Sequence, residues 1–257
     1  MPSPAAAIAH KTYAQPRAYD SKSFAEPKSF AEPRSSARPA HRWTEEADTR
    51  TPTEVVARLG VVASYARNAE IFGEDQPAEN LYIVLSGAVR ICKLLGDGRR
   101  QIETFCLPGD VFGWEMTGRH RFSAEAVSEC KIVRVKRSIL FSRASDDAEL
   151  AHALWALTAA ELGRAQNHLL VLGRKTAQER VATFLLDMAE RAGAGQGPNG
   201  IEVTLPMSRQ DIADFLGLTI ETVSRTLTHL EEISAIALPS SRRVLLRDGA
   251  TLKRLNS

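Results

Sequence analysis

The chain has 257 residues, of which 44% are apolar and 25% charged, and 33 Lys and Arg against 31 Asp and Glu leave a formal net charge of +2. This is the composition of an ordinary globular protein. The near-zero charge excludes a histone-like polycation, so nucleic-acid binding would need a local patch. The chain lacks an apolar run of about 18 residues, a secretion-signal pattern and any C-x-x-C spacing among its three cysteines. We therefore expect a cytoplasmic protein without a membrane partner, disulfide framework or zinc finger.

Residues 1–52 differ in composition from the rest of the chain. They hold seven of the twelve prolines but only four residues of the set Leu, Ile, Val, Met and Phe. The hexapeptide Lys-Ser-Phe-Ala-Glu-Pro occurs twice in tandem, at 22–27 and 28–33. Such a segment buries too little apolar surface to offset the entropy lost on ordering. We expect a disordered tail, either dispensable or a docking segment that uses Phe24 and Phe30.

Residues 53–145 contain short strand-like runs separated by turn signals. The runs 81–85, 88–95 and 101–107 are rich in β-forming residues, and the second and third of them end at the turns Gly-Asp-Gly (96–98) and Pro-Gly-Asp (108–110). Short strands with turn signals every 8–12 residues or so are typical of an antiparallel sandwich or barrel.

Residues 146–172 have the pattern of one long helix. The segment contains no proline, and Leu150, Leu154 and Leu157 recur at i, i+4 and i+7, which places them on one face. The helix would be roughly 40 Å long at 1.5 Å per residue. We expect these leucines to form the interface with a second copy of the chain. The alternative is that the helix lies on its own barrel.

Residues 173–257 begin with a helix over 176–192 and a glycine-rich loop over 193–200, and then contain the signals of two short helices. Ser208 is a candidate N-cap with Asp211 in the first turn, Gly217 suits a left-handed C-terminal position, and Thr219 is a second N-cap. Two helices joined by so tight a turn predict a helix-turn-helix.

The second of these helices has an apolar and a polar face. Val223, Leu227 and Leu230 recur at i, i+4 and i+7, whereas Glu221 and Arg225 point to the opposite side. Arginine can donate two hydrogen bonds to guanine, and glutamate can accept one from cytosine. An ordinary surface ion pair is the alternative. The two caps and the apolar face favour a helix that reads DNA.

The segment 207–225 resembles the DNA-reading helix-turn-helix of the CRP/FNR transcription regulators, and within that family the segment is most similar to the FNR and FixK branches. We call this helix-turn-helix the reader. The order of the upstream segments agrees, and the resemblance covers about residues 53–255. It implies an α+β fold: an N-terminal, jelly-roll-like double-stranded β-roll (53–145), a long dimerisation helix (146–172) and a C-terminal winged helix-turn-helix (173–257).

The resemblance also implies site residues and partners. Base-reading positions fall at Ile220, Glu221, Ser224 and Arg225, and phosphate-binding positions at Ser208, Arg209, Gln210, Thr219 and Thr222. After the reader, the run at 240–243 is typical of a wing hairpin whose Arg242 and Arg243 contact phosphates, or of a solvated turn. We expect a homodimer on an inverted TTGA-type repeat, with half-sites about one turn apart, and RNA polymerase as a partner.

The resemblance leaves the signal open. Members that bind cAMP carry a Gly-Glu pair and then an Arg-Ser or Arg-Thr pair that holds the phosphate. Here Trp114 splits the first pair and His120 stands where the arginine belongs, although Arg121 and Ser123 are a shifted remnant. Because Cys92 is the first cysteine, an N-terminal iron–sulfur cluster is not available. We expect no cofactor and an activator of low-oxygen or related metabolism that acts without an effector, with cyclic-nucleotide or haem binding as alternatives.

Two further classes compete with a regulator. A cupin-like metalloenzyme needs several His and carboxylate ligands, but His120 is the one histidine between residues 53 and 145, and no P-loop, G-x-G-x-x-G or catalytic-triad spacing is present. A ligand-binding module without DNA activity would leave Glu221 and Arg225 without a role. We therefore expect neither enzymatic activity nor a metal site.

Overall fold

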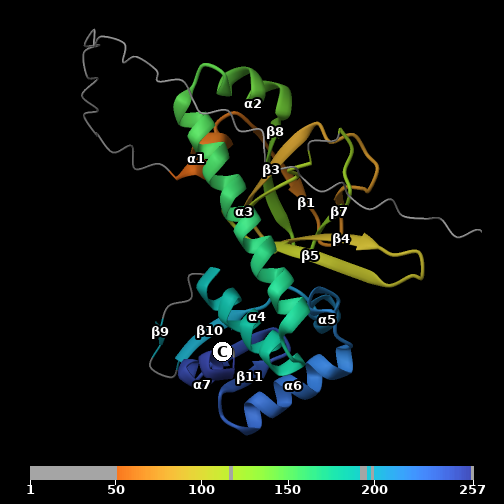
Figure 1. Cartoon of the computed structure of the whole chain (residues 1–257), viewed down its shortest axis with the longest axis vertical. Coiled ribbons are helices and arrows are strands. Elements are labelled where there is room, and N and C mark those ends of the chain that lie inside the picture. Colours follow the sequence, from red (N-terminus) through yellow and green to blue (C-terminus); the bar gives the residue numbers. More distant parts are fainter. Residues whose placement is uncertain (1–50, 116–117, 192–195, 198–199, 256–257) are drawn as a thin grey trace, which may run out of the picture. The chain divides into compact units, whose positions relative to one another are not determined.

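The computed structural model describes residues 51–115, 118–191, 196–197 and 200–255, and it confirms the α+β fold class (Figure 1). The expected tail and its hexapeptide repeat lie outside the described residues, apart from its last two positions. Those two belong to the folded part, because Thr51 caps helix α1 (Pro52–Ala57) through a reciprocal capping box with Glu54.

Eight strands form the β-roll as two four-stranded sheets. One sheet has the order β1 (Val61–Tyr65), β8 (Cys130–Lys136), β3 (Asn80–Ser86) and β6 (Val111–Phe112). The other has the order β2 (Glu70–Phe72), β7 (Ser123–Ala126), β4 (Val89–Leu94) and β5 (Arg100–Cys106). All pairings are antiparallel. Apolar side chains from both sheets, such as Val84, Val89 and Ile132, are buried together between them.

Four elements of the roll were not expected from the sequence: α1, β1, β2 and helix α2 (Arg137–Ala144). Each is short, and β1 carries its apolar residues Val61 and Val62 on an exposed surface. Such segments show no clear alternation, so tertiary pairing with β7 and β8 decides the structure of the two strands.

Helix α3 (Ala148–Arg174) is the long helix, capped by Asp147 at its N-terminus. Its N-terminal half packs on the β-roll, and Leu150 is only 1% exposed within a cluster that includes Leu81 and Val135. Leu154 and Leu157 are partly buried against the same cluster. Leu150, already buried in one chain, adds no contact with a second, whereas Leu154 and Leu157 stay partly exposed and their place in a dimer contact stays a prediction.

The winged helix-turn-helix follows α3. It comprises helix α4 (Ala177–Arg191), strands β9 (Gln196–Gly197) and β10 (Gly200–Thr204), helices α5 (Arg209–Leu216) and α6 (Ile220–Glu232), strands β11 (Ile236–Ser240) and β12 (Arg243–Leu246), and helix α7 (Gly249–Leu255). Its sheet has the order β11-β12-β10-β9.

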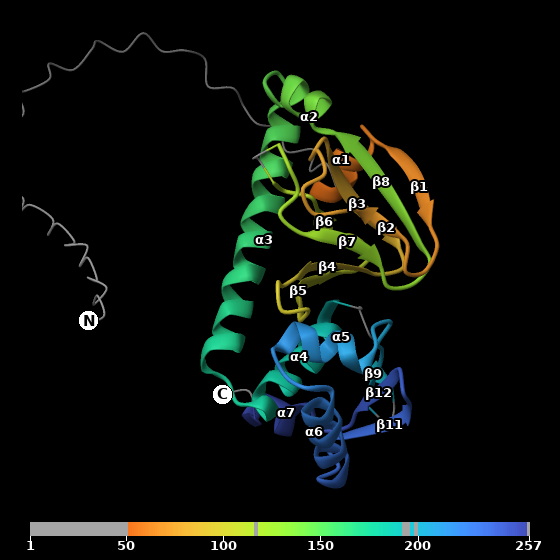
Figure 2. The ribbon, with the colours of Figure 1, turned by 90° about the vertical axis from the view of Figure 1, so that its right-hand side faces the viewer.

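One apolar cluster joins the β4–β5 hairpin, whose β5 is the edge strand of its sheet, to the helix-turn-helix. Phe105 of β5 contacts Phe215 of α5, with ring centroids 5.3 Å apart, and Phe184 of α4 at 6.3 Å. Ile102 and Leu107 belong to the same buried cluster. Figure 2 shows the β4–β5 hairpin lying against α5. The first three helices of the C-terminal part thus share their core with the β-roll.

Candidate nucleic-acid interface

Helix α5 begins at the expected cap. The Ser208 hydroxyl accepts a hydrogen bond from the Asp211 amide at 3.1 Å, and the Ser208 amide donates to the Asp211 carboxylate at 3.0 Å, which completes a capping box. Gly217 ends the helix in the left-handed region, at φ 61°. Thr219 then caps α6 by accepting from the Thr222 amide at 3.2 Å. The predicted helix-turn-helix is confirmed, cap by cap.

The two faces of α6 are also confirmed. Val223, Leu227 and Leu230 are buried in the apolar cluster, whereas Glu221 and Arg225 are exposed. Among the residues that the structure describes, no ion pair joins Glu221 to Arg225 or engages either one. Glu221 and Arg225 therefore do not form an ordinary surface salt bridge with each other, and both side chains are available to a ligand.

The other expected base-reading residues lie on the same side of α6. Ser224 is half-buried at the edge of the polar face, and Ile220 is exposed at the first turn of the helix. An aliphatic side chain in this place can contact a thymine methyl group. The structure therefore brings the four residues together on one accessible face of a helix, which is the geometry that reading a major groove requires.

The expected phosphate-binding residues cluster at the N-termini of α5 and α6. Ser208, Arg209 and Gln210 surround the first turn of α5, and Thr219 and Thr222 the first turn of α6. Free backbone N–H groups and the helix dipole make such termini favourable for anions. Gln210 donates to Asp214 at 2.7 Å, and Arg209 has a buried Nη1 without a hydrogen-bond partner among the described residues.

The wing is the hairpin of β11 and β12, as expected. Its two arginines differ in the free chain: Arg243 forms an ion pair with Glu202 of β10, whereas Arg242 takes part in no ion pair among the described residues. Arg243 must exchange this partner to contact a phosphate. Arg242 is therefore the more readily available cation of the wing.

The sequence did not lead us to assign a second apolar stripe on α3 to the dimer contact. Trp155, Leu162 and Leu169 are exposed by 73%, 59% and 69%, respectively. Their spacing of seven residues places them on one face of the helix, as in a coiled-coil seam. That spacing is visible in the sequence, but it competes there with the equally regular row that begins at Leu150.

The β-roll contains a cavity of about 180 Å³ at the segment that corresponds to the cyclic-nucleotide site. Three carboxylates, those of Glu103, Glu115 and Glu161, line it, with Arg121 as the one cation among the described lining residues. His120 is buried behind the cavity, stacked on Phe72 and bonded to Glu115 through Nδ1 at 3.1 Å. Because Glu161 is paired with Arg164, the lining sets Glu103 and Glu115 beside Arg121 and offers a cyclic phosphate no surplus of positive charge.

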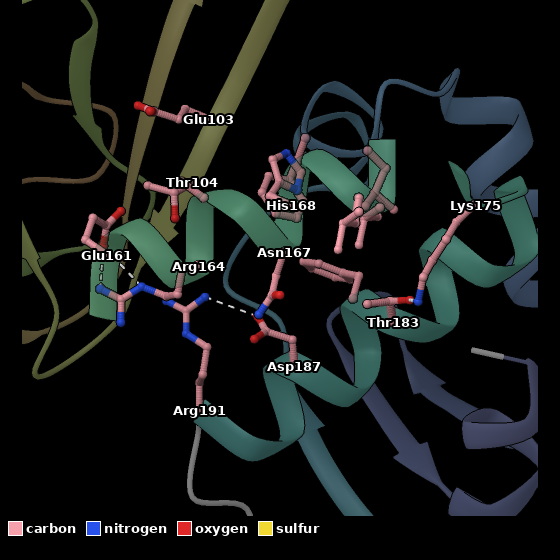
Figure 3. Close-up of a pocket in the computed structure, with 16 residues that line it drawn as sticks. Glu103, Thr104, Glu161, Arg164, Asn167, His168, Lys175, Thr183, Asp187 and Arg191 are labelled. Carbon is pink, nitrogen blue, oxygen red and sulfur yellow. Dashed lines mark hydrogen bonds and ion pairs between the residues drawn. The ribbon is translucent and has the colours of Figure 1, made fainter. Parts of the chain in front are cut away.

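A larger cavity, of about 350 Å³, lies where α3, α4, β5 and α5 meet (Figure 3). Four of its charged groups form two ion pairs: Arg164 pairs with Glu161, and Arg191 pairs with Asp187 at 3.2 Å. His168 stacks on Phe215, and its Nε2 is buried without a partner among the described residues. Burial lowers the pKa of this imidazole, which keeps it neutral near pH 7.

The described residues contain no group of three or more His, Cys, Asp or Glu that could hold a metal ion, and none of their helices is long and apolar enough to cross a bilayer. The three cysteines are buried and unpaired. Burial raises the pKa of Cys92 to about 11 and also raises the pKa of Cys106 and Cys130. These thiols are therefore poor nucleophiles and poor redox sensors.

Comparisons with known proteins agree with this architecture. Residues 179–255 match the family described as Crp-like helix-turn-helix domain, and residues 62–146 match the cyclic nucleotide-binding domain. The chain is 68% identical over 225 residues to the nitrogen fixation regulation protein FixK of Azorhizobium caulinodans, which covers 85% of this chain and 91% of that protein.

Two further matches extend this likeness. The transcriptional activatory protein AadR of Rhodopseudomonas palustris is 40% identical over 193 residues, covering 75% of this chain and 80% of that protein. The structure of FixK2 from Bradyrhizobium japonicum is similar with a TM-score of 0.72 and 49% identity, covering 77% of this chain and 98% of that one.

Proposed function

Because the chain belongs to the FixK branch of the CRP/FNR family of transcription regulators, we propose that it binds an inverted TTGA-type repeat as a homodimer, without a small-molecule effector, and activates transcription. It is a regulator with a DNA-binding helix-turn-helix, not an enzyme. The observation that carries the finer proposal is the exposure of Glu221 and Arg225 on α6, neither of which forms an ion pair within the described part of the chain, while the apolar face of the helix is anchored in the core.

The proposed base contacts follow from the chemistry of that face. Arg225 donates two hydrogen bonds to the guanine of TTGA, Glu221 accepts from the cytosine of the opposite strand, and Ile220 contacts a thymine methyl group. Ser224 adds a hydroxyl at the edge. The N-termini of α5 and α6, together with Arg242 and then Arg243, hold the flanking phosphates and so fix the register of the helix in the groove.

A homodimer places two such helices on the two half-sites. The stripe of Trp155, Leu162 and Leu169 is the surface that we assign to the contact, because three large apolar side chains in one row of a long helix are otherwise exposed to water. Two-fold symmetry then makes the contact self-complementary. The half-sites would lie about 34–36 Å apart, one turn of DNA.

Independence from an effector is supported by the cavity of the β-roll. With Glu161 paired to Arg164, its lining sets Glu103 and Glu115 beside Arg121, so the phosphate of a cyclic nucleotide finds no surplus of positive charge there. The match to a cyclic nucleotide-binding domain favours the alternative of an effector-dependent member. In this chain, however, Trp114 splits the Gly-Glu pair and His120 stands where the phosphate-binding arginine belongs, with Arg121 and Ser123 as a shifted remnant.

The activating role draws on the relatives, one of which is named as an activatory protein. Contact with RNA polymerase follows if this chain acts in the same way, and a role in low-oxygen or related metabolism is proposed from the likeness to FixK. Run-off transcription from a promoter with the repeat should increase when the protein is added to purified polymerase. An unchanged or lower yield would argue against activation.

The DNA proposal is tested by fluorescence anisotropy. A duplex with TTGA-N6-TCAA and a scrambled duplex of the same composition are titrated at roughly 0.15 M salt, with and without cAMP. We expect the repeat to bind at least about 1,000-fold more tightly than the scrambled duplex and cAMP to change neither affinity. Equal affinity for both duplexes contradicts sequence-specific regulation, and a requirement for cAMP contradicts independence from an effector.

A further inference from the structure

Two arginines of the β4–β5 hairpin contact two aspartates of α5. Arg100 bridges both acids, with Nη2 at 2.6 Å from Asp211 and Nε at 2.8 Å from Asp214. Arg90 donates to Asp211 at 3.3 Å and also binds Glu125 of its own sheet at 2.8 Å. We call these four residues, Arg90, Arg100, Asp211 and Asp214, the hairpin latch.

The latch is shielded from water. The side chain of Asp211 is 6% exposed and that of Asp214 13%, while Arg90 and Arg100 retain 12% and 25%. Ion pairs that are shielded in this way are screened less by salt than surface pairs, and removing one partner leaves an uncompensated charge. The latch therefore constrains its two elements more strongly than an exposed salt bridge would.

Asp211 connects the latch to the DNA-facing end of α5. One carboxylate oxygen accepts from Arg90 and Arg100, while the other accepts from the Ser208 hydroxyl at 2.7 Å and from its amide at 3.0 Å. Burial acts to raise the pKa of Asp211, but the hydrogen bonds from Ser208 and the two nearby arginines outweigh it and hold the pKa below its usual value. The carboxylate is therefore charged at neutral pH and keeps both sets of contacts.

The latch also offsets negative charge near the DNA-facing end of α5. Asp211 and Asp214 lie in the helix whose N-terminus is expected to meet a phosphate. Two uncompensated carboxylates there would repel DNA. Arg100, in contact with both, and Arg90, in contact with Asp211, offset this negative charge from the side of the β-roll.

We propose that Arg90 and Arg100 of the β-roll are positioning residues for DNA recognition, which hold α5, and through it α6, in one orientation relative to the long helix α3. In a dimer this orientation sets the separation of the two reading helices, so that both meet their half-sites at once. The inference rests on the proposed function. The latch would also explain why no effector is needed, because ion pairs within the chain already orient the reader.

An inhibitory latch that acts by covering α6 is disfavoured by the exposure of the polar side chains of this helix. With the latch closed, Glu221 and Arg225 are both exposed, and no described residue covers them. A contact that inhibits by covering the reader would bury them. The closed latch and an accessible reader thus occur together in the same structure.

The test compares Arg100→Ala with Arg99→Ala in the full chain. Arg99 is the adjacent hairpin residue, 78% exposed, and pairs with Asp97 rather than with α5, so both variants lose the same charge. Binding is measured to a duplex with the full inverted repeat and to one with a single half-site. We expect Arg100→Ala to weaken binding to the full repeat about tenfold or more, because a smaller fraction of molecules holds both readers in place. Binding to the single half-site should weaken several-fold less than binding to the full repeat, because only the lost positive charge beside Asp211 and Asp214 acts there, and Arg99→Ala should resemble the wild type on both duplexes.

Conservative and paired variants complete the design. Arg100→Lys keeps the charge but loses the simultaneous contact with Asp211 and Asp214. Its affinity for the full repeat should therefore lie between those of the wild type and Arg100→Ala. Adding Asp214→Ala to Arg100→Ala should weaken binding less than the two single changes combined, because both remove the same contact. Circular dichroism confirms that each variant is folded. For a variant that is not folded, the measurement is made on Arg100→Lys.

The outcomes separate this inference from the proposed function. If the wild type binds the full inverted repeat no more tightly than the single half-site, the proposed function fails. If the wild type prefers it and Arg100→Ala binds equally well or more tightly, the positioning role is overturned while the function stands. An equal loss on the full repeat and on the half-site also overturns the positioning role, because it would show a purely local effect on phosphate contact.

Discussion

Replacing Leu162 by alanine is expected to weaken self-association of the chain. Leu162 lies in the middle of the exposed stripe on α3 and is 59% exposed in the single chain. Complete burial of a leucine side chain contributes about 1.5–3 kcal/mol, so burying the exposed share contributes about 1–2 kcal/mol. Two-fold symmetry doubles this to about 2–4 kcal/mol, which raises the dimer Kd roughly 30- to 700-fold.

Sedimentation equilibrium over a range of protein concentrations measures this Kd directly. Val61→Ala is the matched control, because Val61 is also a highly exposed aliphatic residue but lies on β1 of the roll. The control should dimerise like the wild type. A dimer Kd of Leu162→Ala within threefold or so of the wild-type value would refute the assignment of the stripe to the dimer contact.

Three further outcomes are expected. Arg225→Ala should cost about 1–3 kcal/mol of DNA-binding free energy and reduce discrimination at the guanine; a uniform loss on all duplexes, measured by anisotropy, would instead make Arg225 a phosphate contact. The free energy of unfolding should fall as the pH drops below about 6.5, because burial lowers the pKa of His168 in the folded chain and the unfolded chain then binds more protons. His168→Phe, which keeps a ring stacked on Phe215, should reduce this dependence in urea unfolding at several pH values but not remove it, because burial also lowers the pKa of His120; an unchanged slope would assign the dependence to groups other than His168. Finally, the three buried thiols, whose pKa values are raised, should react with a thiol reagent far more slowly in the native protein than in denaturant; rapid native labelling would show that they are accessible.

The helix-turn-helix was predictable because its determinants are local. Ser208, Gly217 and Thr219 act on backbone groups within a few residues of themselves, so caps and turn can be recognised in a single segment. The strands of the roll that are bounded by glycine turns were predictable for the same reason. By contrast, β1 has no such signal of its own and depends on pairing with β8.

The burial of Leu150 against its own β-roll was not the first expectation, because α3 has two regular apolar rows. One begins at Leu150 and the other contains Trp155 and Leu162, and periodicity alone does not tell which row its own β-roll covers. The ion pairs of the hairpin latch could not be predicted from the sequence for a related reason. Arg100 and Asp211 are 111 residues apart in the chain and meet only after both halves have folded.

The apolar cluster that runs from Phe105 to Phe215 has a consequence for how such regulators can be recombined. A chimera that joined this helix-turn-helix to a foreign sensor at the end of α3 would leave Phe184 and Phe215 facing a hairpin that did not evolve with them. Transplanting the DNA specificity alone would instead require exchanging the few exposed positions of α6. The DNA specificity of such a regulator can therefore change more easily by substitutions on the exposed surface of α6 than by exchange of whole segments.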